Sequence, residues 1–132
     1  MVQRVENHGG GVVITRPILV VDDDPAILET VAEILSDEGY TVVTARNGAE
    51  GLAAVERAVP ALVLLDRWMP LLDGQGFWQA LQQRGVVVPV IVMTAAHDGE
   101  IWANELQAAG ILLKPFKLPM LLSLVAQVLR TA

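Results

Sequence analysis

The chain has 132 residues, is 53% hydrophobic and carries a formal net charge of −6, which suits one domain with one sizeable core and excludes two. The basic residues are scattered, which argues against direct nucleic-acid binding, and the longest apolar stretch, residues 86–93, is too short to span a membrane. Without cysteine there are no disulfides or thiolate metal sites, and without a signal peptide at the N-terminus we expect a cytoplasmic protein.

Residues 1–16 are expected to form a flexible tail, because residues 8–11 contain three glycines and no hydrophobic periodicity, and residues 17–132 are expected to form the domain. Residues 12–14 could also extend the first strand of the domain. From residue 18 onward, short apolar runs alternate with segments of helical spacing. The pattern predicts strands at 18–22, 40–44, 61–66, 89–93 and 110–113, and helices at about 25–38, 48–58, 75–84, 98–109 and 117–130. Asp24 and Asn47 are suitable caps for the first two helices.

The predicted strands are continuously apolar, as is typical of strands that helices cover on both faces of a sheet. Strand and helix alternate throughout, which indicates an α/β fold with a five-stranded parallel sheet and right-handed crossovers. In such sheets the functional crevice lies beyond the carboxyl ends of the strands.

Polar residues stand at those carboxyl ends. Asp22 and Asp23 follow the first strand, Asp66 ends the third, Thr94 ends the fourth and Lys114 follows the fifth. At a separation of about 4 Å and an effective dielectric of ~20, each pair of carboxylates would cost roughly 4 kcal/mol, so three of them need cations. Oxygen ligands alone favour a hard cation such as Mg²⁺, and Lys114 adds a second positive charge.

A site of this composition suits phosphoryl transfer. A carboxylate can act as the nucleophile, while cations stabilise the oxygens of the transferring group and the Thr94 hydroxyl donates a hydrogen bond to one of them. The product would be a mixed anhydride on one of the aspartates.

Four segments in order carry a resemblance to a known family: residues 18–25, residues 64–74, residues 92–95 and residues 114–116. Over residues 17–130 the chain resembles the response-regulator receiver domains of two-component signalling. The resemblance implies a doubly wound (βα)5 fold of the flavodoxin or CheY type with strand order 2-1-3-4-5, and a cis Lys114–Pro115 bond.

The same resemblance implies the role of each site residue. Asp66 would be the phosphoacceptor, and Thr94 and Lys114 would contact the phosphoryl group. Asp22, Asp23 and Asp66 would bind Mg²⁺ together with the backbone carbonyl of Trp68, and of the first two Asp23 is favoured as the direct ligand. Ala95 would be the small residue that admits the phosphoryl group.

By resemblance the protein is a phosphorylated signalling protein and not an enzyme, although it assists its own phosphorylation and slow dephosphorylation. A histidine kinase or a phosphotransfer protein would be the donor, and phosphorylation would change a surface that binds a partner. With about two residues after the last helix, we expect a receiver without an output domain, either complete or cut from a longer chain.

Three departures from the family pattern bear on function. Ile111 stands where receivers usually carry an aromatic residue, which turns inward when the threonine moves toward the phosphoryl group. Because Ile111 is aliphatic, this coupling between Thr94 and residue 111 is in doubt. The segment from 99 to 114 also looks short. Trp68, two residues after Asp66, is bulky, and we hypothesise that it shields the phosphoryl group from water. An exposed Trp102 would be a suitable anchor for a partner.

The same residues also bear on other functions. A flavin-binding protein needs a hydroxyl- or glycine-rich phosphate loop, and the acidic residues 22–24 would repel the phosphate. A phosphatase with an aspartyl nucleophile often has a second aspartate where Trp68 stands. A degenerate receiver that binds partners without phosphorylation is the alternative function. Four further residues have ordinary structural interpretations: Asp73 as a turn residue, Trp78 as a packing residue, and His8 and His97 as surface residues.

Overall fold

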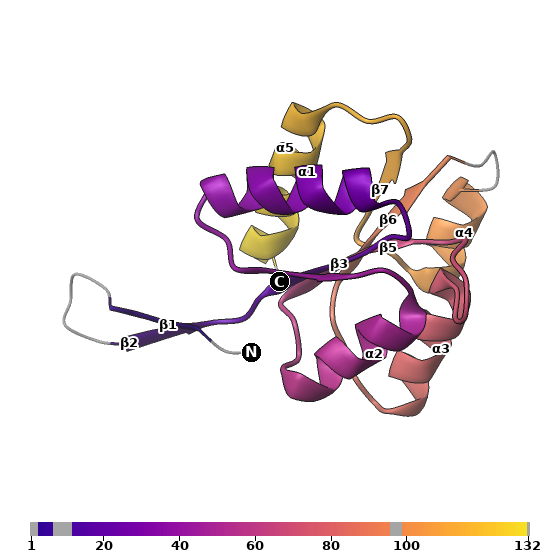
Figure 1. Cartoon of the computed structure of the whole chain (residues 1–132), viewed down its shortest axis with the longest axis horizontal. Coiled ribbons are helices and arrows are strands. Elements are labelled where there is room, and N and C mark those ends of the chain that lie inside the picture. Colours follow the sequence, from indigo (N-terminus) through magenta and orange to yellow (C-terminus); the bar gives the residue numbers. More distant parts are fainter. Residues whose placement is uncertain (1–2, 7–11, 96–98, 132) are drawn as a thin grey trace.

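The computed structural model describes residues 3–6, 12–95 and 99–131, and these form a parallel five-stranded sheet with helices on both faces (Figure 1). The strand order is β4-β3-β5-β6-β7, which is the order 2-1-3-4-5 of the domain's own strands, so the predicted fold class is confirmed. The strands of this sheet are β3 (Ile18–Val21), β4 (Val42–Ala45), β5 (Leu62–Asp66), β6 (Val90–Thr94) and β7 (Gly110–Leu113).

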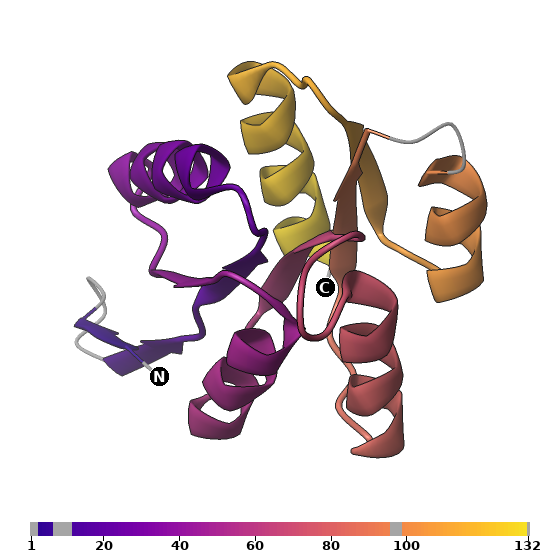
Figure 2. The same ribbon diagram turned by 45° about the vertical axis from the view of Figure 1, so that its right-hand side comes forward.

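The helices divide between the two faces of the sheet (Figures 1 and 2). They are α1 (Pro25–Asp37), α2 (Gly48–Arg57), α3 (Gly74–Gln83), α4 (Gly99–Leu106) and α5 (Leu118–Thr131). Helices α1 and α5 share one core cluster with alternate strand residues such as Val20 and Leu64. Helices α2, α3 and α4 share the other cluster with the intervening residues, such as Val21 and Leu65. The three central strands, β3, β5 and β6, are therefore buried on both faces, which explains their apolar sequences.

Local hydrogen bonds begin three of the helices close to their predicted positions. Asp24, Asn47 and Asp73 are the N-caps of α1, α2 and α3, and each side chain accepts a hydrogen bond from a backbone N–H in the first turn. Asp24 and Asn47 confirm the predicted caps. Asp73, interpreted from the sequence as a turn residue, also begins a helix.

The N-terminal segment contains a separate antiparallel pair, β1 (Gln3–Glu6) and β2 (Val12–Thr15), which does not join the main sheet. Residues 12–14 do not extend the first strand of the main sheet but belong to β2, which pairs with β1. The flexibility of residues 1–16 stays a prediction. His8 and His97 lie outside the described residues. Within the described ranges, no helix has the length and apolar character that crossing a membrane requires.

Candidate functional site

The parallel sheet brings five predicted site residues to its carboxyl edge. Asp22 immediately follows β3, with Asp23 next to it, Asp66 and Thr94 are the last residues of β5 and β6, and Lys114 follows β7. Asp22, Asp66 and Thr94 are buried, whereas Asp23 is exposed. Residues that are far apart in the sequence thus form one site, because parallel strands end at a common edge.

Three carboxylates meet at the centre of this site. Asp22, Asp23 and Asp66 each present an oxygen, and these oxygens all lie within 4.8 Å of one another. Asp22 is held in place by its neighbours, since its Oδ1 accepts a hydrogen bond of 2.9 Å from the backbone N–H of Asp24. Asp66 Oδ1 likewise accepts a hydrogen bond of 2.9 Å from the backbone N–H of Arg67. Fixed carboxylate oxygens around a common point fit a hard divalent cation.

Lys114 reaches across the site to two of the acids. Its Nζ lies 2.7 Å from Asp22 Oδ2 and 3.4 Å from Asp66 Oδ1. Burial disfavours the charged ammonium, but the hydrogen bond to Asp22 and the charge of Asp66 outweigh it, and the pKa of Lys114 is raised. The Lys114–Pro115 peptide bond is cis, as expected.

The charges of the site do not balance without a further cation. Burial, assisted by the negative charge of Asp22, raises the pKa of Asp66 to about 6, although Lys114 acts in the opposite direction. The carboxyl of Asp66 therefore resists ionisation in the protein alone. Ligands that are all oxygen and a surplus of negative charge are the conditions under which a hard cation binds, so the residues present fit Mg²⁺.

Three side chains stack next to the end of β5, where Asp66 lies. The guanidinium of Arg67 lies 4.7 Å from the centre of the Trp68 ring and 5.4 Å from that of Trp102. Trp102 is completely buried, and its Nε1 donates a hydrogen bond of 2.6 Å to Gln75 Oε1. The hypothesis that Trp102 is an exposed anchor is therefore wrong, because α4 turns this side chain onto the sheet.

The loop between β5 and α3 is held tightly around this stack. The N–H of Gly74 donates to the carbonyl of Arg67 at 2.7 Å, and the N–H of Gly48 donates to the carbonyl of Leu72 at 2.7 Å. A Cβ atom at Gly74 would collide with the carbonyl of Asp66 and the ring of Trp102. Because Gly74 has no side chain, the start of α3 can lie against the backbone of Asp66 and the ring of Trp102. Trp68 is 59% exposed at the rim, and the metal-ligand role of its carbonyl stays a prediction.

Ile111 packs at the other end of the site, half-buried against the core. A Cβ added at Gly99, the first residue of α4, would lie 2.6 Å from the Thr94 methyl and 3.4 Å from Ile111 Cδ1. The Thr94 methyl and Ile111 Cδ1 therefore both lie close to the first residue of α4. Helix α4 has 8 residues, in keeping with the short segment noted in the sequence.

Comparison with known proteins decides the family. The model of the response regulator receiver domain matches residues 18–126, which is most of the chain. The chain belongs to the response-regulator receiver family. Response regulators are the receiving partners of two-component signalling systems, so the recognition made from the four sequence segments is confirmed.

Curated relatives of this receiver include transcriptional regulators. A probable transcriptional regulator, ycf27, of Pyropia yezoensis is 39% identical over 117 residues, which cover 87% of the receiver and 48% of the relative. The alkaline phosphatase synthesis transcriptional regulatory protein PhoP of Bacillus subtilis is 34% identical over 78% of the receiver and 44% of its own length. The chain spans about half the length of the curated relatives it matches.

Solved structures show the same architecture. The receiver domain of NtrX from Brucella abortus superposes with a TM-score of 0.80 at 34% identity, over 87% of this chain and 99% of that one. The chemotaxis response regulator CheY4 of Vibrio cholerae superposes with a TM-score of 0.78 at 30% identity, over 86% and 98%.

The sequence predicted the acids, Thr94 and Lys114, but it did not predict the stack around Arg67. Trp68 is adjacent to Arg67 in the sequence, so the contact between these two side chains could have been predicted. Trp102 lies on another helix, and nothing in a linear pattern pairs it with Arg67.

Proposed function

We propose that this receiver accepts a phosphoryl group on Asp66 from a histidine kinase or a phosphotransfer protein, and that the modification switches a partner-binding surface. The observation that carries the proposal is the convergence of Asp22, Asp23 and Asp66 with Lys114, whose Nζ lies 3.4 Å from Asp66 Oδ1. Three acids and one lysine in this arrangement suit the transfer of a group that carries negative charge.

The transfer is a single displacement at phosphorus. A carboxylate oxygen of Asp66 attacks the phosphorus of a phosphohistidine, the P–N bond breaks as the P–O bond forms, and the leaving imidazole takes up a proton. The backbone N–H of Arg67 keeps Asp66 oriented. Lys114 stabilises the phosphoryl oxygens, and Thr94, the last residue of β6, donates a hydrogen bond from its hydroxyl.

Asp22, Asp23, Asp66 and the Trp68 carbonyl would hold Mg²⁺. The bound ion would supply positive charge to the phosphoryl oxygens and relieve the repulsion among the carboxylates. Asp23 is the exposed member of the cluster and so faces the side from which an ion and a donor arrive.

A groove beside the site suits the donor. A cavity of about 450 Å³ lies between α1 and the segment after β7, and it is lined mainly by apolar residues with Lys114 at one end. Ile27 and Phe116 are among its walls. An apolar surface next to an acidic centre lets a helical donor dock without repulsion from the acids.

A degenerate receiver, which binds partners without phosphorylation, is the second candidate, and Ile111 in place of the usual aromatic favours it. The two functions differ in chemistry. Incubation with acetyl phosphate and Mg²⁺ should add one phosphate to the intact mass of the native chain and none to Asp66→Asn. No added mass in the native chain would favour the binding module.

Phosphoryl donors that draw on ATP act in the cytoplasm, and we place this receiver there. The self-dephosphorylation expected of a receiver would make the signal transient. That this chain itself makes no contact with nucleic acid stays a prediction from its charge, since the relatives named as transcriptional regulators are about twice as long.

A further inference from the structure

The β1–β2 hairpin stands apart from the rest of the receiver. It projects from one corner of the molecule, and residues 16 and 17 join it to β3 (Figures 1 and 2). Within the described residues its two strands pair only with each other. A two-stranded hairpin is marginally stable in water by itself, so a further strand would stabilise it.

Strand β2 has an unprotected outer edge. Its sequence is Val-Val-Ile-Thr, four β-branched residues without a charge or a proline. Natural proteins usually protect the edge of a sheet with charged residues, proline or a bulge, because unpaired backbone groups recruit another strand. The composition of β2 is typical of a strand that has a hydrogen-bonded neighbouring strand at each of its two edges.

Strand β4 is the second unprotected edge. It is the outermost strand of the main sheet, and its sequence, Val-Val-Thr-Ala, also lacks charge and proline. Thr41 and Ala45 direct their carbonyls to β3, where they accept from Ile18 at 2.8 Å and from Asp22 at 3.0 Å. Because backbone groups alternate in direction along a strand, those of Val42 and Thr44 face the open edge.

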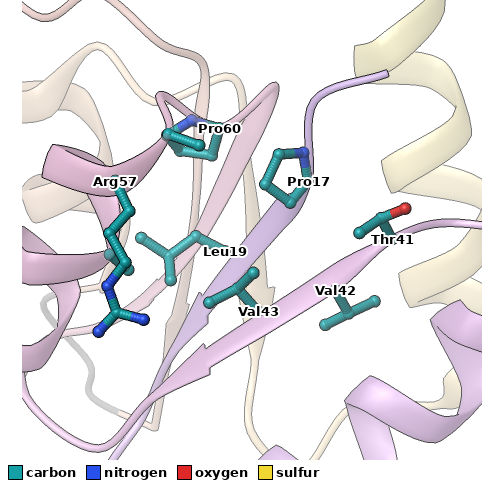
Figure 3. A pocket seen from close by; sticks show the side chains of 9 residues that line it. Pro17, Leu19, Thr41, Val42, Val43, Arg57 and Pro60 are labelled. Carbon is teal, nitrogen blue, oxygen red and sulfur yellow. The ribbon is translucent and has the colours of Figure 1, made fainter. Parts of the chain in front are cut away.

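Neighbouring helices leave room along this edge. A cavity of about 310 Å³ opens at Val42 and Val43, with Pro17 and Pro60 on its other walls and Arg57 as the charged residue in its lining (Figure 3). A second cavity of about 370 Å³ includes Thr44. Each outward-facing residue of β4 therefore borders a hollow that an added strand could enter.

We propose that the hairpin of one receiver adds to the β4 edge of a second copy, with β2 as the added strand, and that the exchange is reciprocal. One two-fold contact then protects both exposed edges, since each copy gives a hairpin and receives one. Backbone hydrogen bonds from Val42 and Thr44 would hold the strands together, and the added strand would lie along the edge where the cavity at Val42 and Val43 opens. This association does not depend on phosphorylation of Asp66.

The oligomeric state of the full chain tests the proposal. Light scattering after size-exclusion chromatography should give twice the chain mass of 14.2 kDa for the native protein. A chain that starts at Pro17 should give a single chain mass at the same concentration. Thr44→Pro should do the same, because proline removes the outward N–H and leaves the bonds of β4 to β3 in place. A monomeric full chain, or a dimer that survives either change, overturns the proposal.

A cross-link locates the contact independently of variants that affect folding. The chain has no native cysteine, so Val13→Cys and Thr44→Cys can be prepared separately, mixed and treated with a short bis-maleimide. The proposal expects a mixed dimer of these two variants. Met120→Cys, on an exposed position of α5, is the matched control for Thr44→Cys. Equal cross-linking to the control, or none to Thr44→Cys, overturns the proposed contact.

Discussion

Lys114 and Asp22 form an ion pair of 2.7 Å between the segments that follow β7 and β3. The two strands are not neighbours in the sheet, since β5 and β6 lie between them. The Asp22 carboxylate is completely buried, so this lysine is its main source of compensating positive charge in the metal-free protein. The pair links the segments after β3 and β7 past Asp66, whose Oδ1 lies 3.4 Å from Lys114 Nζ.

Replacement of Lys114 by methionine should therefore destabilise the metal-free protein. Asp22 would remain buried without its charged partner, and the free energy of unfolding should fall by about 3 kcal/mol. Urea denaturation in EDTA measures the loss. Lys117→Met, an exposed lysine three positions later, should have little effect. If the two variants unfold alike, the ion pair does not support the fold.

Asp66→Asn should change the dependence of stability on pH. The pKa of Asp66 is raised in the folded protein, from 3.8 to about 6, so its neutral form favours the folded state. That contribution is fully present below pH 3.8 and is lost as the pH rises through about 6. Above that pH the asparagine variant should be more stable than the native protein by at most about 3 kcal/mol in metal-free buffer.

Urea denaturation at pH 4 and pH 7.5 in EDTA measures this difference, which should be small at the lower pH. Asp37→Asn, which alters an exposed aspartate, should show no such trend. A native protein that is as stable as Asp66→Asn at pH 7.5 without metal would show that burial and the charge of Asp22 do not raise the pKa of Asp66 in the folded protein.

Trp68→Asn should shorten the lifetime of the phosphorylated receiver several-fold. Trp68, two residues after Asp66, is 59% exposed, and the guanidinium of Arg67 lies 4.7 Å from the centre of its ring. A smaller polar side chain would admit the attacking water. Loss of radiolabelled phosphate after removal of the donor gives the rate, with Trp78→Phe on α3 as control. If the asparagine variant loses phosphate no faster than the native receiver, the shielding hypothesis is wrong.

Leu71→Asn should stabilise the receiver by about 1 kcal/mol, because asparagine tolerates the left-handed conformation better than leucine does. Leu71 has a φ of 68° and is 88% exposed, so its side chain gains little from packing. Thermal unfolding measures the gain. Val87→Asn is a matched control, since Val87 is 92% exposed and does not have a positive φ. Equal shifts in both variants would assign the effect to surface polarity instead.

The sequence predicted most element positions, but it did not predict where α4 ends. The predicted helix 98–109 extends beyond Leu106, because Gln107 carries no residue-type signal for a helix end. Gln107 nevertheless has a φ of 53°, and the N–H of Ala108 bonds to the carbonyl of Ala103 at 2.9 Å. This hydrogen-bonded end is usually formed with glycine, so a glutamine there is recognised only from the backbone.

Taken alone, the sequence determined the fold class, the family and which polar residues stand at the carboxyl ends of the strands, because apolar strand runs and the polar residues after them are local patterns. The tertiary structure decided which side chains meet. The burial of Trp102 against Arg67 and the free edge of β4 depend on contacts between segments that are distant in the chain, and a local pattern carries no information about its distant partner.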